Sequence, residues 1–311
     1  MIIGIGCIAL DRILATKAHW KDEKGKIIRS ENRFGGNIRN SLVALSALGM
    51  KTAFLGTMSG EEKWLSAFED FASNGVSTEF VDLDSRSHPA EATVVITGDG
   101  QRFIIYDDTP LHHIKLPSPE KVEVALASAE LIMVDGGICP EGTLEIMKRA
   151  RKLNIPVVLD AEQFVVARET VLEMIKIASD LILPMNFSKT VTGEEEISKI
   201  LSALWNENRN IVVITDGSNG CYFQLPGSDK AQHLAAYKIK AIDTNGTGDI
   251  FHGCYAYGIL NGMDAIASLR FASAGAARIA MFEHGVSRLP KMELIQEFMA
   301  MNEEPALSLL S

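Results

Sequence analysis

The feature that most restricts the fold is a regular alternation of strand and helix patterns between residues 119 and 215. Apolar runs of strand length alternate with longer stretches of helical periodicity. The predicted strands are Leu131–Val134, Pro156–Leu159, Leu181–Leu183 and Ile211–Thr215, and the predicted helices are Val122–Ala129, Glu141–Leu153 and Val171–Ala178. Repeated units of this kind form a parallel sheet covered by helices on both faces. We therefore expect an α/β fold with a mostly parallel central sheet.

Polar residues stand where three of these strands end. Asp135 and Asp160 close two of the runs, and Asn186 follows a third. Ligands of open α/β sheets bind beyond the carboxyl ends of the strands. The sequence therefore predicts a binding site at this edge of the sheet.

Two regions predict a second, smaller sheet. Residues 12–34 alternate apolar with charged positions, and Glu91–Ile96 and Arg102–Tyr106 alternate on either side of Gly98-Asp99-Gly100, a hairpin signal. A chain of 311 residues can form one large domain or two modest ones. We expect one domain over 1–311, with segments of about 12–34 and 88–110 inserted as a small sheet.

Composition excludes several classes of partner. The chain is 47% hydrophobic and carries a net charge of −10, with Lys and Arg scattered along it. A nucleic-acid or membrane-surface protein would need a basic face, so we expect neither partner. The four cysteines form no C-x-x-C pair, and the N-terminus has no basic stretch typical of a signal peptide. These features predict a cytoplasmic protein.

The stretch from Asp243 to Asp249 predicts an anion site. Gly246 and Gly248 precede a helical pattern that runs to Asn261. Glycine lets backbone N–H groups converge, and a helix start adds unpaired N–H groups and a positive dipole end. Asp249 would stand beside this site, where a carboxylate can accept a proton from an attacking hydroxyl. The alternative is an Asn-Gly turn that caps an ordinary helix.

A second glycine-rich helix start lies far upstream. Gly35-Gly36 permits close backbone approach, and Asn37 and Asn40 are neighbours on one helical face. An amide side chain both donates and accepts hydrogen bonds, which suits a polyol. The alternative is an Asn cap with one tolerated Asn in the helix.

These motifs resemble the ribokinase-like (PfkB) carbohydrate kinases, nearest to the ketohexokinase and sulfofructose kinase branch. The stretch 243–249 is similar to the family signature D-T-x-G-A-G-D, with Thr247 in place of Ala, and 35–41 is similar to G-G-N-x-x-N-S. The resemblance implies a ribokinase-like fold whose small sheet is a lid. It implies Asp249 as catalytic base, with Gly246, Thr247 and Gly248 as the anion hole. The residues that it implies for sugar binding are Asp11, Gly35, Gly36, Asn37, Asn40 and Asp107.

The resemblance also implies a site for ATP and Mg²⁺. Strand Ile211–Thr215 and the following turn resemble the family's T-x-G-x-x-G element. The implied nucleotide-binding residues are Asn186, Thr215, Gly217, Gly220, Asp243 and Ser273. Mg²⁺ is expected through phosphates and water near Asn186 and Asp243, and a monovalent cation is a further candidate cofactor.

Three positions depart from the family pattern. Arg39 stands where small residues are common, and we expect it to point to solvent or to the lid. Lys189 replaces the Glu of N-x-x-E, and is either a phosphate contact or a surface residue. Gly60-Glu61-Glu62 stands where many members have G-D-D-x-x-G.

Taken with the resemblance, the motifs favour an ATP-dependent kinase of a small sugar, with a ketohexose such as fructose as first candidate. A ribokinase or nucleoside kinase of the same family is an alternative, and Trp20 or Tyr106 would then stack on a base. A non-catalytic sugar- or nucleotide-binding protein is another alternative. The resemblance further implies a homodimer formed through the lid sheet.

Overall fold

The chain folds around one large sheet, seen in a computed structural model that describes residues 1–98, 102–107, 109–228, 230–283, 289 and 291–310. Its strand order is β16-β15-β14-β13-β12-β11-β10-β1-β4-β6. The strands are β1 (Ile2–Ile5), β4 (Thr52–Phe54), β6 (Val76–Ser77), β10 (Leu131–Asp135), β11 (Val157–Asp160), β12 (Asp180–Pro184), β13 (Ile211–Thr215), β14 (Cys221–Gln224), β15 (Gln232–Leu234) and β16 (Leu307–Leu309). Pairing is parallel from β6 to β13 and antiparallel from β13 to β16.

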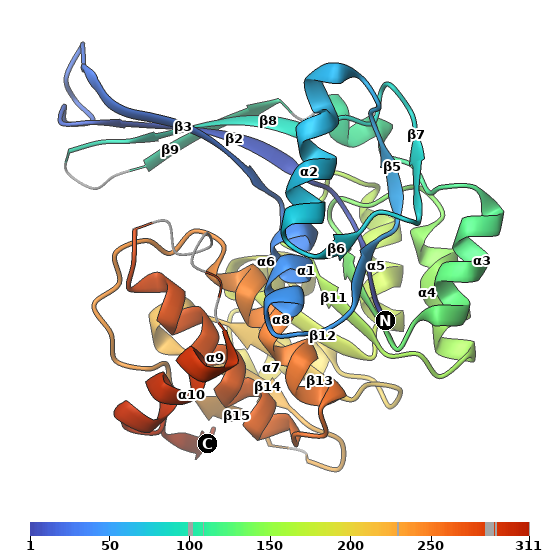
Figure 1. Ribbon diagram of the computed structural model, residues 1–311. Coiled ribbons are helices and arrows are strands. Elements are labelled where there is room, and N and C mark those ends of the chain that lie inside the picture. Colours follow the sequence, from blue (N-terminus) through green and yellow to red (C-terminus); the bar gives the residue numbers. More distant parts are fainter. Residues whose placement is uncertain (99–101, 108, 229, 284–288, 290, 311) are drawn as a thin grey trace.

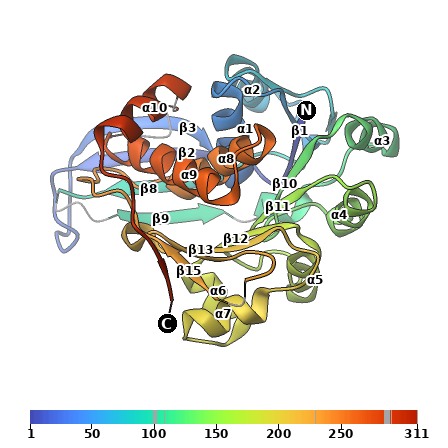
Figure 2. The same ribbon diagram turned by 90° about the horizontal axis from the view of Figure 1, so that it is seen from below.

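Helices cover both faces of this sheet (Figure 2). One face carries α1 (Asn37–Ala47), α2 (Leu65–Ser73), α8 (Thr247–Leu260), α9 (Ala265–Ala280) and α10 (Met292–Met301). The other carries α3 (Pro119–Ser128), α4 (Thr143–Lys152), α5 (Arg168–Ile177), α6 (Met185–Thr192) and α7 (Ile197–Leu204). Neighbouring strand residues pack on opposite faces: Leu131 belongs to the first apolar core and Ile132 to the second. Burial on both faces explains why these strands are continuous apolar runs.

A separate four-stranded sheet extends away from the helices and the central sheet (Figure 1). It consists of β2 (Ala9–Thr16), β3 (Ile27–Gly35), β8 (Ala90–Ile96) and β9 (Arg102–Asp107), in the order β3-β2-β8-β9. A two-stranded sheet joins β5 (Gly56–Met58) to β7 (Val81–Leu83), and short 3₁₀ turns cover Glu62–Trp64, Thr109–His113 and Gly217–Asn219. The predicted fold class, with its parallel central sheet and small second sheet, is confirmed.

Several predicted boundaries were wrong. The apolar run over residues 2–9 predicts one buried strand, and the family resemblance implies that Asp11 stands at its end. The strand instead ends at Ile5, and Asp11 belongs to β2 of the small sheet. The sequence pattern also predicts a strand over Ala235–Ile239, but these residues form none. Strand β15 lies just before them, and the C-terminal β16 pairs with it. Helices α2, α6 and α7 were not predicted. The centre of the predicted Gly98-Asp99-Gly100 turn lies outside the described residues.

Within the described part of the chain, no helix has the length and apolar character needed to cross a lipid bilayer.

Candidate active site

Two helix starts meet beside the carboxyl ends of the parallel strands. Helices α1 and α8 pack together, with the Ser41 hydroxyl donating to the Asp249 carbonyl at 3.0 Å. A Cβ on Gly253 would lie 2.9 Å from the Ser41 carbonyl oxygen, so glycine allows this close approach. The packing brings two motifs together that lie about two hundred residues apart in sequence.

Both helix starts depend on glycines with left-handed backbone. Gly36 precedes α1 with φ 98°, and Gly246 precedes α8 with φ 69°. Beyond Gly246, a Cβ added to Gly248 would have no atom of the described residues within 4 Å. The first N–H groups of a helix lack intrahelical partners and attract anions. The geometry at the start of α8 therefore suits a phosphate.

Asp249 lies in the first turn of α8, partly buried. Its Oδ2 accepts a hydrogen bond from Asn40 Nδ2 at 2.7 Å. Burial raises the pKa of Asp249 to about 6; the Asn40 bond and His252 oppose this rise, and Glu162 and Asp11 add to it. A carboxyl with such a pKa is mostly ionised at neutral pH yet basic enough to accept a proton.

His252, one turn further along α8, is buried between backbone carbonyls. Its Nδ1 lies 2.8 Å from the Gly248 carbonyl oxygen and its Nε2 lies 3.1 Å from that of Ile182. Carbonyls only accept hydrogen bonds, so the ring is the donor where it bonds to them. The Asp160 carboxyl, 3.6 Å from Nε2, faces the ring. His252 thus ties α8 to strand β12 beneath the helix mouth.

Two further carboxyls lie at adjacent strand ends, as the sequence predicted. Asp135 and Asp160 pair in register across β10 and β11. Burial is the main cause that raises the pKa of both, and neighbouring acids raise them further: Asp160 and Glu162 around Asp135, Asp249 and Glu162 around Asp160. The Asp135 carboxyl accepts from the N–H groups of Gly137 and Ile138, so it orders the chain after β10.

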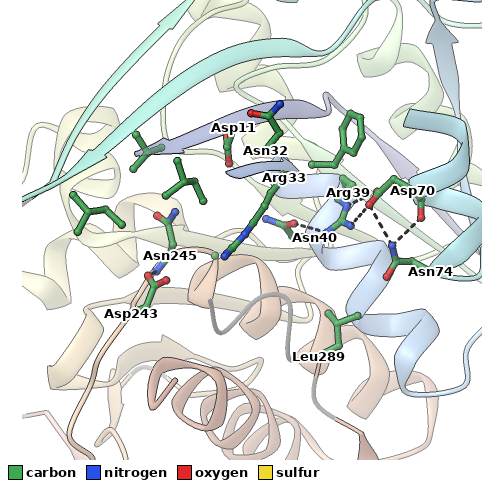
Figure 3. A pocket seen from close by; sticks show the side chains of 16 residues that line it. Asp11, Asn32, Arg33, Arg39, Asn40, Asp70, Asn74, Asp243, Asn245 and Leu289 are labelled. Atoms are coloured by element: carbon green, nitrogen blue, oxygen red, sulfur yellow. Dashed lines mark hydrogen bonds and ion pairs between the residues drawn. The ribbon is translucent and has the colours of Figure 1, made fainter. Parts of the chain in front are cut away.

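A cavity of about 380 Å³ opens between the small sheet and the start of α8 (Figure 3). Its lining combines polar side chains from β2, β3, α1 and α2 with aliphatic ones from β2 and β8. It is lined by Asp11, Ile13, Asn32, Arg33, Phe34, Gly35, Arg39, Asn40, Asp70, Asn74, Val94, Ile96, Asp243, Asn245, Gly246 and Leu289. Burial raises the pKa of Asp11, while Arg33 and Arg39 oppose the rise.

The predicted sugar residues divide into two groups. Asp11, Gly35 and Asn40 line the cavity. Asn37 is not among the lining residues, and its Nδ2 donates to Glu162 Oε1 at 3.4 Å. Gly36 supports the turn without lining the cavity. Asp107 is exposed at the end of β9 and accepts from the Thr109 N–H at 2.9 Å, away from the cavity lining.

Of the predicted nucleotide residues, Asp243 lines the cavity and the others lie outside it. Thr215 ends β13 in register with Pro184, so Asn186 at the start of α6 follows the neighbouring strand end. Gly217 and Gly220 form the turn after β13, with φ of 52° and 94°. Ser273 lies on α9, which packs against α8.

Two of the departures from the family pattern have clear environments. Arg39 does not point to solvent: its side chain is 9% exposed and pairs with Asp70 at 2.7 Å. Its aliphatic stem packs in the interior while the guanidinium meets a carboxylate on α2, which was not predicted as a helix. Lys189 pairs with the exposed Glu195 at 2.6 Å, and its own side chain is 35% exposed.

Sequence reasoning missed several cavity residues, chief among them Asn32, Arg33, Asp70 and Asn74. They come from the exposed-looking strand β3 and from α2 and its C-terminal end. Glu162 was missed although it follows Asp160 by two residues at a strand end, a position that could have marked it.

The expected Mg²⁺ site, held through phosphates and water near Asn186 and Asp243, stays a prediction. Among the described residues, no group of three or more His, Cys, Asp and Glu side chains is arranged to hold a metal ion. Mg²⁺ in phosphotransfer sites is usually held by one or two carboxylates together with phosphates and water. The Asp243 carboxyl, close to the start of α8, can supply such a contact.

Comparison with known proteins gives consistent matches over most of the chain. The profile described as pfkB family carbohydrate kinase matches residues 1–292. A 5-dehydro-2-deoxygluconokinase of Bacillus licheniformis is 24% identical, with 86% of each chain covered. A ribokinase of Haemophilus influenzae is 22% identical, covering 95% of this chain and 97% of that one. A protein named probable fructokinase-5, from Arabidopsis thaliana, is 25% identical over 71% and 72% of the two chains.

Solved structures match in fold. A ribokinase of Thermotoga maritima has a TM-score of 0.79 and 21% identity, covering 96% of this chain and 99% of that one. An Arabidopsis thaliana ribokinase complexed with ribose and ATP has a TM-score of 0.79 and 19% identity, covering 96% and 97%. At these identities the structural likeness concerns the ribokinase-like fold.

Proposed function

Because this chain belongs to the pfkB family of carbohydrate kinases, and is thus a sugar kinase, we propose that it phosphorylates a small carbohydrate with ATP. The first candidate substrate is a ketohexose such as fructose. The observation that carries the proposal is the position of Asp249. Its carboxyl stands beside the open first turn of α8 and hydrogen-bonds Asn40, which lines the cavity. A base, an anion site and a cavity for a polyol are thereby adjacent.

The proposed reaction needs one proton transfer and one displacement. Asp249 accepts the proton of the sugar hydroxyl as that oxygen bonds to the γ-phosphorus of ATP. The bond from the γ-phosphorus to the β–γ bridging oxygen breaks, and ADP leaves. Backbone N–H groups around Gly246, Thr247 and Gly248 receive the charge that develops on the transferred group. Mg²⁺ would be held through phosphates near Asp243 and Asn186, where it would neutralise phosphate charge.

The cavity lining supports a sugar as the acceptor. Asp11, Asn32 and Asn40 present carboxylate and amide groups that can bind hydroxyls. Trp20 and Tyr106, the aromatic residues that a nucleoside kinase would have used, do not line this cavity, and Tyr106 is 55% exposed. The lining thus favours a sugar over a nucleoside. Relatives named ribokinase and fructokinase leave pentoses and ketohexoses both open.

The small sheet is proposed to be both lid and dimer contact. Its edge strands expose large apolar side chains, which a second copy of the chain would cover. These are Ile27 and Ile28 on β3, and Phe103, Ile104, Ile105 and Tyr106 on β9. Sedimentation of a monomer at micromolar concentration would contradict the dimer.

A coupled assay of ADP release over ketoses, ribose, nucleosides and phosphosugars tests the function. We expect turnover with a sugar, and Asp249→Asn should lower kcat by roughly 10²–10⁴ because the proton acceptor is lost. Turnover of this variant at the wild-type rate would refute the assigned base. Calorimetric binding of a sugar without ADP release would instead favour the non-catalytic alternative.

A further inference from the structure

A chain of hydrogen bonds connects helix α2 with Asp249 through Arg39 and Asn40. Arg39 donates to both carboxylate oxygens of Asp70, from Nε at 2.8 Å and from Nη2 at 2.7 Å (Figure 3). Its third nitrogen, Nη1, donates to Asn40 Oδ1 at 3.1 Å. Asn40 Nδ2 in turn donates to Asp249 Oδ2 at 2.7 Å. We propose that Arg39 is a positioning residue that sets the orientation of the Asn40 amide toward Asp249.

The direction of this chain follows from what each group can donate. A guanidinium has only donors and a carboxylate only acceptors, whereas an amide has one end of each kind. With the amide as observed, its oxygen faces Arg39 and its NH₂ faces Asp249. If the amide turned over, two donors would face each other at Arg39 and two acceptors would face each other at Asp249. Arg39 therefore excludes the orientation in which Asn40 could not bond to the base.

Arg39 is itself held rigidly. The side-on pair with Asp70 uses two parallel N–H···O bonds, a geometry with strong directional preference. Exposed fractions of 9% for the Arg39 side chain and 18% for that of Asp70 mean that water screens this pair little. Asn74, at the end of α2, donates to the Asp70 backbone and side-chain oxygens at 2.8 and 3.3 Å. Helix α2 thus supports the orientation of Asn40 without reaching Asp249.

The consequence for the proposed reaction concerns the two oxygens of Asp249. Asn40 engages Oδ2, so the proposed proton transfer is assigned to Oδ1. The bond from Asn40 also favours the ionised carboxylate. Loss of the bond should make Asp249 harder to ionise. The other titratable groups that act on Asp249 stay in place when Arg39 changes. They are Asp11 on β2, Cys7 after β1, Asp160 and Glu162 at and after the end of β11, and His252 on α8.

The test compares the ionisation of Asp249 in the wild type and in Arg39→Met/Asp70→Asn. The double change removes the pair together, so that no uncompensated charge is left inside. A ¹³C NMR titration of the Asp249 carboxyl needs no turnover. We expect the midpoint to rise by about one pH unit, since a hydrogen bond to a charged group is worth about that much. The acid limb of the pH profile of kcat/KM should move by the same amount. The double variant should then have about tenfold lower kcat/KM than the wild type at pH 5.5 and nearly the same value at pH 8.5.

Two comparisons separate positioning from a general loss of structure. In an Asn40→Ala background, adding Arg39→Met/Asp70→Asn should cause no further shift, because the effect acts through Asn40. Arg209→Met is the matched control. Arg209 is a buried arginine before β13, at the opposite end of the strands, and it donates to the backbone carbonyls of Leu204, Ala178 and Ile175. Arg209→Met should lower the stability of the protein and leave the acid limb of the kcat/KM profile unchanged.

An unchanged Asp249 titration in the double variant would overturn the proposal. So would an equally large shift of the midpoint when Arg39→Met/Asp70→Asn is added to the Asn40→Ala variant. The inference rests on the proposed function for its meaning in catalysis. If the NMR midpoint shifts as expected but no sugar supports ADP release, the positioning stands and the kinase assignment fails.

Discussion

The charge state of a single residue, Asp249, links the stability of this protein to its proposed reaction. Burial raises the pKa of Asp249 from its ordinary 3.8 to about 6. Between these values the folded state holds a proton that the unfolded chain releases. The raised pKa of Asp249 therefore contributes stability to the folded state. This contribution is fully present below pH 3.8 and is lost as the pH rises through 6. The reaction needs the ionised carboxylate of Asp249 at neutral pH, and this is the form that burial disfavours.

We therefore predict that Asp249→Asn is more stable than the wild type at pH 8, although it is less active. An amide carries no charge, so the cost of burying a carboxylate disappears, which should be worth about 2 kcal/mol. Urea unfolding at pH 8 and at pH 4 measures this, and the difference should vanish at the lower pH. Equal stability of the two proteins at both values would show that the Asp249 carboxyl is not strained by burial.

Arg39 shows at the same scale what the sequence alone could not give. Small residues are common at this position in the family, and the cation there is expected to face solvent or the lid. Its partner Asp70 lies 31 residues away on α2, and only the packing of two helices brings them together. Asn40 and Asp249 were predicted from their local motifs, whereas their direct contact could not be.

Among the elements, the strands that are buried on both faces were predicted best from the sequence. Strands β10 to β13 were found to within a residue or two because helices cover both their faces, which makes the apolar run continuous. Strands β15 and β16, of three residues each, carry too short a pattern. Helix α8 was predicted from its glycines, since a left-handed residue at the N-cap marks its start.

The start of α1 gives a prediction with an internal control. Gly36 and Gly49 flank this helix with φ of 98° and 89°, so alanine strains both by a comparable amount, about 1 kcal/mol. A Cβ on Gly36 would also lie 2.8 Å from the Cys7 carbonyl oxygen, whereas one on Gly49 meets open space. Gly36→Ala should therefore cost about 2 kcal/mol more than Gly49→Ala in urea unfolding. Equal costs would mean that the segment after β1, which includes Cys7, can move away from Gly36 at little cost.

For the whole molecule, the arrangement places a small sheet over one side of a cavity whose other side is the start of α8 (Figures 1 and 3). Beside polar residues of β2 and β3, the sheet contributes three aliphatic side chains to the lining: Ile13, Val94 and Ile96. Apolar walls exclude water, which competes with the sugar as an acceptor of the phosphoryl group. The family resemblance predicted a lid, and these side chains indicate what it would do.

Side chains along β8 alternate between the two faces of the small sheet, so neighbouring residues can test whether its inner face excludes water. Ile96 lines the cavity, and Val95 points to the opposite face, where it borders a second hollow with Trp20. Ile96→Ser should raise KM for the sugar by about tenfold, roughly the loss of one buried aliphatic contact, and should increase ADP release without sugar. Val95→Ser removes a similar area on the other face and should leave both quantities close to wild type. If both variants behave alike, the sheet acts through its stability alone, and its aliphatic inner face has no part in excluding water.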